Sequence, residues 1–269
     1  MNRSDLDAIS HRLAQLKDEL QVDIFPDWGN NPDGTWQPGR WTKAELDKLH
    51  HHIDLLARAM GGNENFIRNI GGVQFKKANI GSHGGEALLH RVSLSEKGTF
   101  TAWTVIHELA HTWDANHGWR LSVALEKFTG GLTSPSLSYF KRLVGWRDSA
   151  FSSPEDQPGR RGRLPGCNKA GYFYGDQPSG SNWAFNRKED FAESVAMYAG
   201  WDRDNELSKQ AHARVERYLL PNGARDPFFG MVDDWADYAR YFYPANGDYG
   251  KTKRWEFIDR LVHGKITLP

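Results

Sequence analysis

The residues most able to do chemistry lie between Val105 and Trp113, where the sequence reads VIHELAHTW. On an α-helix, His107 and His111 are about 40° apart around the axis and about 6 Å apart along it, so both imidazoles can face one ion. Glu108 lies about 100° from His107 and so flanks that ion without binding it. This spacing predicts one zinc ion held by two histidines, with a carboxylate beside it.

These residue types are suited to hydrolysis. Two neutral imidazoles and a third protein ligand leave one position at a tetrahedral zinc ion for water, whose pKa zinc lowers to about 7. Glu108 could take a proton from this water and pass it to a leaving amine. The sequence therefore predicts Glu108 as a general base, while the hydrogen-bond donor for the oxyanion is not identified.

Apolar residues surround the two histidines, as in a helix buried inside a fold. They are Trp103, Val105, Ile106, Leu109, Ala110 and Trp113. Polar side chains in such a segment are costly to bury without partners, and a metal ion would supply one. The alternative is an amphipathic helix in which both histidines are structural.

The third ligand is expected in the segment from Arg187 to Tyr198, RKEDFAESVAMY. Its apolar residues recur at three- and four-residue spacing, which predicts a helix with one face in the core. Glu193 lies toward the apolar side and is the predicted ligand. Glu189, one turn earlier and roughly in line with Glu193, could bind the metal instead or hold a histidine, and Asp190 is a further alternative.

HELAH followed by a helix carrying EDFAE resembles the gluzincin metallopeptidases, and the second motif is similar to the glutamate helix of the anthrax lethal factor-like peptidases. The resemblance covers mainly residues 72–200. It implies a zincin-like catalytic domain in which His107, His111 and Glu193 bind one zinc ion and Glu108 is the general base. It also implies that the protein hydrolyses peptide bonds in a peptide or protein substrate.

Two features depart from the pattern of this family. The long segment between His111 and Glu193 implies an insertion between the two active-site helices. The tyrosine that assists the transition state in the lethal factor-like enzymes is also not matched, because Asn186 stands at the comparable place, seven residues before Glu193. The candidate replacements are Tyr172, Tyr174 and Tyr198, and the sequence does not choose between them.

His117 offers a rival third ligand. Its spacing after the two histidines is that of the metzincin motif, with Met197 in the role of the methionine in that family's turn. Ligation through His117 requires a sharp turn near Asp114, because a continuous helix would carry His117 about 9 Å past His111. Asp114 is instead expected to support a ligand or the helix end, with Gly118 as a C-cap.

Composition narrows the remaining function classes. The chain of 269 residues has a formal net charge of zero, which gives no electrostatic argument for binding nucleic acid. Its single cysteine, Cys167, excludes an internal disulfide framework, although this thiol could bind the zinc and block the enzyme.

A zinc site closed by a fourth protein ligand such as His117 or Cys167 would indicate a binding module for protein or glycan. A zinc amidase acting on a non-protein substrate is a second alternative.

The start of the chain, Met1 to Leu20, lacks the apolar segment of a signal peptide, and no stretch is long enough to span a membrane. We therefore expect a soluble protein, either cytoplasmic as the chain is written or a fragment of an exported precursor. The sequence gives no prediction of the oligomeric state.

Hydrophobic periodicity predicts an α+β fold that is predominantly helical, with a small sheet beside the HELAH helix. Strands are expected at 73–78 and 87–94, and a strand at the sheet edge could hold an extended substrate. Helices are expected at 4–22, 42–60, 121–128, 135–143, 205–220, 232–242 and 253–262, with a long loop over 152–181. We expect residues 1–62 to form a helical appendage and residues 63–269 the metallopeptidase domain.

Two details of the N-terminal part follow from local sequence. Thr42 and Glu45 have the spacing of a capping box, which marks the start of a helix. Trp28, Trp36 and Trp41 lie in or beside a polar loop and could form an aromatic binding surface.

Overall fold

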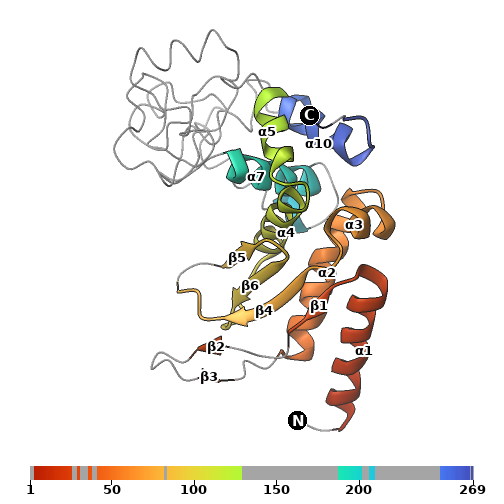
Figure 1. The fold of residues 1–269 in the computed structure, drawn as a ribbon. Coiled ribbons are helices and arrows are strands. Elements are labelled where there is room, and N and C mark those ends of the chain that lie inside the picture. Colours follow the sequence, from red (N-terminus) through yellow and green to blue (C-terminus); the bar gives the residue numbers. More distant parts are fainter. Residues whose placement is uncertain are drawn as a thin grey trace, which may run out of the picture. The chain divides into compact units, whose positions relative to one another are not determined.

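The computed structural model describes residues 3–25, 29–30, 36–37, 41–81, 84–128, 187–201, 206–209, 249–266 and 268. The chain divides into two compact units, Met1–Gly118 and Trp119–Pro269. The described residues are mostly helical, and the first unit also holds a small sheet (Figure 1). The predicted α+β, predominantly helical class is therefore confirmed. The boundary expected after residue 62 stays a prediction.

Three helices open the first unit: α1 (Arg3–Leu20), α2 (Lys43–Ala59) and α3 (Asn63–Ile70). The first two confirm the helices predicted at 4–22 and 42–60, whereas α3 was not predicted. α2 contacts α1, α3 and the later helix α4 (Ala102–Asn116). The N-terminal helices thus pack directly on the helix that carries the HELAH motif.

The start of α2 is fixed by the predicted capping box. The Thr42 hydroxyl accepts a hydrogen bond from the Glu45 amide at 3.2 Å, and the Glu45 carboxylate accepts one from the Thr42 amide at 2.8 Å. Gly61 follows the helix with a φ of 88°, a backbone conformation that glycine adopts without steric cost. Local sequence therefore determines both ends of this helix.

The first unit contains a four-stranded sheet, with strands in the order β1 (Asp23–Ile24), β4 (Gln74–Ala78), β6 (Arg91–Ser95) and β5 (Gly85–Leu88). β4 pairs in parallel with both β1 and β6, and β5 pairs antiparallel with β6 at the edge. The strand predicted at 87–94 is wrong as a single element, because a turn at Leu89 and His90 divides it between β5 and β6. Leu89 adopts a φ of 53° in this turn.

Trp41 belongs to the core and not to an exposed aromatic surface. Its side chain is buried, and its ring packs edge-on against Phe100 with ring centroids 6.2 Å apart. Lys77 lies over the Trp41 ring and forms a buried ion pair with Glu45 at 2.7 Å. The surface predicted from Trp28, Trp36 and Trp41 is therefore wrong for Trp41. Trp28 lies outside the described residues.

Two further strands lie in the polar segment before α2. β2 (Gly29–Asn30) and β3 (Trp36–Gln37) form an antiparallel pair. The other residues between them lie outside the described part of the chain.

The second unit contains α5 (Arg120–Phe128), α7 (Arg187–Gly200), η4 (Tyr249–Lys251) and α10 (Lys253–Val262). α7 packs against both α5 and α10. The helices predicted at 121–128 and 253–262 are confirmed. Three further predictions lie outside the described residues: the helices at 135–143 and 232–242 and the loop at 152–181. Most of the helix predicted at 205–220 also lies outside them, but residues 206–209 are described and are helical.

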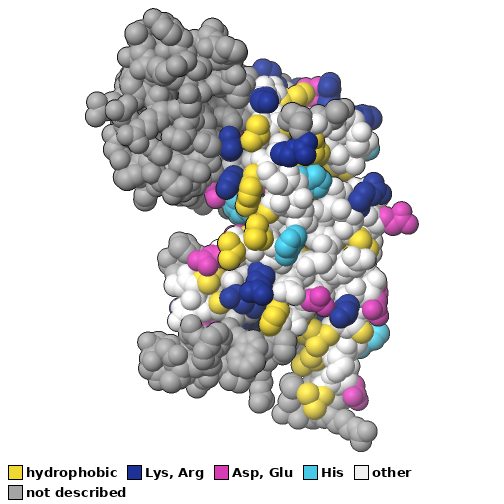
Figure 2. All heavy atoms as spheres, in the orientation of Figure 1, with side chains coloured by type: hydrophobic (Ala, Val, Ile, Leu, Met, Phe, Trp, Pro, Cys, Tyr) yellow, Lys and Arg dark blue, Asp and Glu magenta, His cyan; other side chains and the backbone are white. Residues whose placement is uncertain are grey.

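The surface mixes apolar and charged side chains. On the face drawn in Figure 2, hydrophobic side chains are interspersed with charged side chains of both signs. Among the described residues, the large hydrophobic side chains with the greatest exposure are Leu88 and Leu89, 74% and 52% exposed, where β5 leads into the turn. No helix in the described ranges has the length and apolar character needed to cross a bilayer.

His52 provides a test of packing within the first unit. It lies on α2 with 2% of its surface exposed, and its ring meets the Phe100 ring edge-on at 6.2 Å. Burial, together with the nearby charges of Lys48 and His51, lowers the pKa of His52 to about 4. Below pH 6.5 the unfolded chain consequently binds more protons than the folded one.

We predict that stability falls as the pH decreases from about 6.5 to about 4, and that His52 accounts for up to about 3 kcal/mol of the loss. His52→Gln should flatten this part of the pH profile, measured by urea denaturation at several pH values. His90→Gln changes an exposed histidine in the turn between β5 and β6, away from His52, and should leave the profile unaltered. Equal slopes in the wild-type protein and His52→Gln would contradict the assignment.

Candidate metal centre

α4 holds both histidines on one rigid, mostly buried helix. Thr101 caps its first turn by accepting a hydrogen bond from the Thr104 amide at 3.2 Å. Near its other end, Trp113 donates to the Asn69 side chain at 3.2 Å and Asn116 donates to the Asn69 carbonyl at 3.0 Å. Asn69 belongs to α3, so these two hydrogen bonds tie the C-terminal end of α4 to a neighbouring helix.

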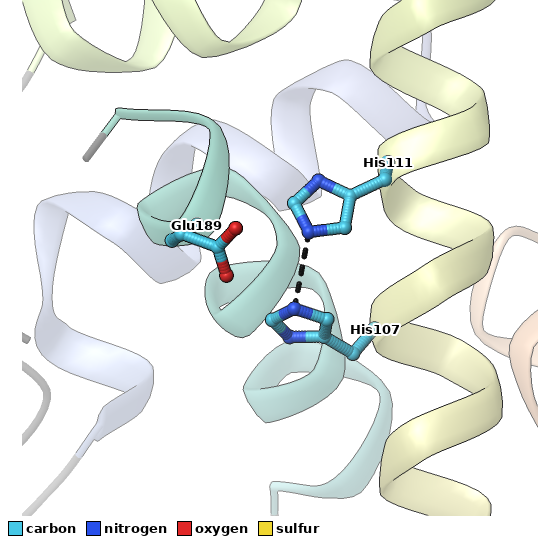
Figure 3. A group of neighbouring side chains, drawn as sticks. All are labelled: His107, His111 and Glu189. Atoms are coloured by element: carbon cyan, nitrogen blue, oxygen red, sulfur yellow. Dashed lines mark hydrogen bonds between the residues drawn. The ribbon is translucent and has the colours of Figure 1, made fainter. Parts of the chain in front are cut away.

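The two imidazoles meet edge-on across a single turn of α4, within hydrogen-bonding distance of each other (Figure 3). Their Nε2 atoms are 3.1 Å apart, and the ring planes lie at 83°. Two nitrogens bound tetrahedrally to one zinc ion would be about 3.3 Å apart, given zinc–nitrogen bonds of about 2.0–2.1 Å. The positions of His107 and His111 therefore fit a shared metal ion.

Glu189, in the first turn of α7, joins His107 and His111 in a group of three potential metal ligands. One potential ligand atom from each of His107, His111 and Glu189 lies within 4.8 Å of the others (Figure 3). Two imidazole nitrogens and one carboxylate oxygen are a donor set that suits zinc. This His–His–Glu group could hold one metal ion.

Glu193, the ligand predicted first, lies one turn after Glu189 on α7 and is partly exposed. Within the described residues it does not belong to the group of three. The expectation that α7 has one core-facing side is wrong, because the helix is buried on nearly all sides from Asp190 to Gly200. An apolar setting therefore does not distinguish Glu193 from Glu189. Its assignment as a ligand stays a prediction.

Glu108 is buried between α4 and the edge strand of the sheet. It is 8% exposed, and β5 contacts α4 along this side. A methyl group added at Gly85 would stand 2.8 Å from Glu108 Cγ and 2.9 Å from Thr104 Cγ2. Gly85 was not predicted from the sequence. Its signal is the pair of glycines, Gly84 and Gly85, at the start of a strand.

The remaining residues on α4 bear on the rival metal site. The helix continues through Asp114 to Asn116, so the sharp turn required for ligation by His117 is absent. His117 is the C-cap residue, and its Nδ1 lies 3.0 Å from the Trp113 carbonyl oxygen. Gly118 follows with a φ of 63°, as expected at a helix end. Asp114 is fully buried on the helix, and its supporting role stays a prediction.

The predicted transition-state donors are placed only in part. The Tyr198 hydroxyl donates to the Asp259 carboxylate at 3.0 Å, within the second unit. Tyr172, Tyr174 and Cys167 lie outside the described residues, so their predicted roles are untested.

A buried ion pair beside Glu189, between Asp190 and Arg254, was also not predicted from the sequence. Arg254 donates to both carboxylate oxygens of Asp190, at 2.8 and 3.2 Å. Burial raises the pKa of Asp190, and the Arg254 guanidinium opposes that rise. Asp190 stands within the EDFAE motif, but its partner is too distant in sequence for any local pattern to indicate.

Comparison with known proteins gives no match to a family model, a curated protein or a solved structure. The resemblance to gluzincins therefore rests on the two motifs and on the His–His–Glu group.

Gly85→Ala tests how closely β5 approaches the Glu108 side chain. The added methyl group would overlap both Glu108 and Thr104, so we predict a loss of about 1–3 kcal/mol in unfolding free energy. Gly84→Ala is the matched control, because its methyl group would stand 3.2 Å from the nearest atoms, which belong to Thr104 alone. Urea denaturation of both variants measures the difference. Equal stability of the two would show that β5 has room beside Glu108.

Proposed function

We propose that the protein is a zinc-dependent metallopeptidase of gluzincin type. The observation that carries the proposal is the grouping of His107, His111 and Glu189, with Glu108 next to His107 on the same buried helix. Zinc is the proposed ion because nitrogen and carboxylate donors with a short separation between imidazoles suit its tetrahedral preference.

Each residue has a defined task in this proposal. His107, His111 and a carboxylate from α7 hold the ion, which when bound supplies a Lewis acid for a water molecule and a carbonyl group. Glu108 accepts the proton of the attacking water and returns it to the leaving amine. Its contact with β5 supports this role, because a carboxylate packed against a strand has few alternative positions.

The proposed substrate is a peptide or protein segment in an extended conformation. β5 lies at the edge of the four-stranded sheet and packs beside Glu108. A sheet edge presents backbone donors and acceptors that an extended peptide can pair with. We therefore place the substrate backbone along β5, which would bring its scissile bond toward Glu108.

Glu108→Gln tests the catalytic role. The variant should bind zinc within about twofold of the wild-type protein, because Glu108 is not a proposed ligand. Its kcat/KM should fall by roughly 10²- to 10⁴-fold, the usual contribution of a general base. The substrate is the peptide cut best from a mixed library, with cleavage sites read by mass spectrometry with and without a chelator.

Glu64→Gln, at an exposed position on α3, is the control and should retain full activity. Full activity in Glu108→Gln would remove Glu108 from its role. A wild-type protein that binds zinc but cuts no peptide would favour a structural zinc site or a non-protein substrate.

Two matched variants, Glu189→Gln and Glu193→Gln, decide the third ligand. We predict that Glu189→Gln weakens zinc binding by more than the roughly 10- to 100-fold expected when only a supporting hydrogen bond is lost. Glu193→Gln should weaken it less. Competition with a chromophoric chelator measures both affinities, and His107→Ala serves as the positive control. The reverse order would establish Glu193 as the ligand.

A further inference from the structure

Three polar residues on one side of α7 form hydrogen bonds with the C-terminal segment of the chain. Asp190, Ser194 and Tyr198 are spaced by four residues and therefore lie along one side of the helix. Arg254 donates to the Asp190 carboxylate, and Tyr249 donates to the Ser194 carbonyl oxygen at 3.3 Å. The Tyr198 hydroxyl donates to Asp259, as described above. η4 and α10 thus hold this side of α7 along most of its length.

The strongest of these bonds is the ion pair at the first turn. Arg254 and Asp190 are 2% and 0% exposed, and the guanidinium binds both carboxylate oxygens. The Ser194 hydroxyl donates to the same carboxylate at 3.3 Å. A planar guanidinium that binds two oxygens at once restricts the angle of approach as well as the distance.

This restriction acts on the adjacent residue, Glu189. Consecutive side chains on a helix are about 100° apart, so fixing the direction of Asp190 also fixes the direction in which Glu189 leaves the helix. Lys188 lies over the Trp119 ring at 3.9 Å, a second contact at the same turn. The first turn of α7 is therefore oriented by groups on either side of Glu189 in sequence.

The ion pair between Arg254 and Asp190 is better explained by the orientation that it gives to α7 than by a gain in the stability of the fold. A buried ion pair often contributes little net stability compared with apolar residues of similar size, whereas its geometry is demanding. Elsewhere α7 already buries a run of apolar side chains, including Phe191, Val195 and Met197. The helix does not need a further buried charge pair in order to pack.

We infer that Arg254 is a positioning residue for the metal centre, which acts through Asp190 to aim the Glu189 carboxylate. The inference rests on the proposed function, because it requires Glu189 to bind the metal. Arg254 itself touches neither the ion nor the substrate in this arrangement.

Arg254→Lys in the full chain is the main test, since lysine keeps the charge but cannot bind both oxygens in the same plane. Zinc affinity, measured by chelator competition, should fall about 10- to 100-fold, as for other groups that orient a ligand. The absorption spectrum of the cobalt-loaded protein should also change. Arg260→Lys is the matched control on α10, because Arg260 pairs with Glu256 at the exposed surface.

A double variant separates positioning from general stability. In the Glu189→Gln background, Arg254→Lys should cause little further loss of zinc affinity, because the carboxylate that it orients is already gone. A purely structural role would give the same loss in both backgrounds. Circular dichroism of the metal-free proteins checks that each variant is folded.

Asp190→Asn provides a second variant if Arg254→Lys does not fold. Zinc affinity within twofold of wild type in either folded variant, with an unchanged cobalt spectrum, would overturn the inference. Failure of both metal-free variants to fold would also overturn it, because the pair would then be needed for folding itself. A wild-type protein whose zinc binding does not depend on His107 and His111 would remove the proposed function as well.

Discussion

The close approach of two imidazoles on a buried helix is the constraint on which the rest of the candidate site depends. Polar rings in an apolar setting are unfavourable unless they have partners, and the Nε2 atoms of His107 and His111 stand 3.1 Å apart. α4 packs against α2, α3 and β5, and this packing holds in place the backbone that carries both rings. At this distance the two nitrogens can share a hydrogen bond or bind one metal ion together, so the geometry is compatible with a metal site.

The first unit can be understood as a support for this helix. Thr101 caps its first turn, Asn69 bonds its other end, and β5 packs against Glu108 through Gly85, where an added methyl group would overlap the Glu108 side chain. The sheet places β5 at its edge by pairing it with β6 alone among the described strands. β5 thus restrains Glu108, the proposed general base, and also forms the sheet edge on which we place the substrate.

The proposed third ligand is a carboxylate on α7, and the choice of residue depends on its position along the helix axis. Glu189 and Glu193 are one turn apart on α7, so their directions are similar and their depths along the axis differ. Asp190, the fully buried charged residue between them, is held by Arg254. A buried carboxylate that accepts two hydrogen bonds from one guanidinium has a restricted orientation, and this restriction extends to the neighbouring residues of the helix.

Local sequence by itself determined the histidine pair, Glu108 and the helices α2, α4, α5 and α10. These features depend on interactions three or four residues apart, such as the Thr42–Glu45 capping box, which a linear sequence displays directly. Only the tertiary structure decided that Trp41 is buried, that residues 87–94 form parts of two strands, and that Glu189 groups with the histidines. It also decided the pairing of Asp190 with Arg254. Burial and helix rotation are set by residues distant in the chain, and no local pattern records those contacts.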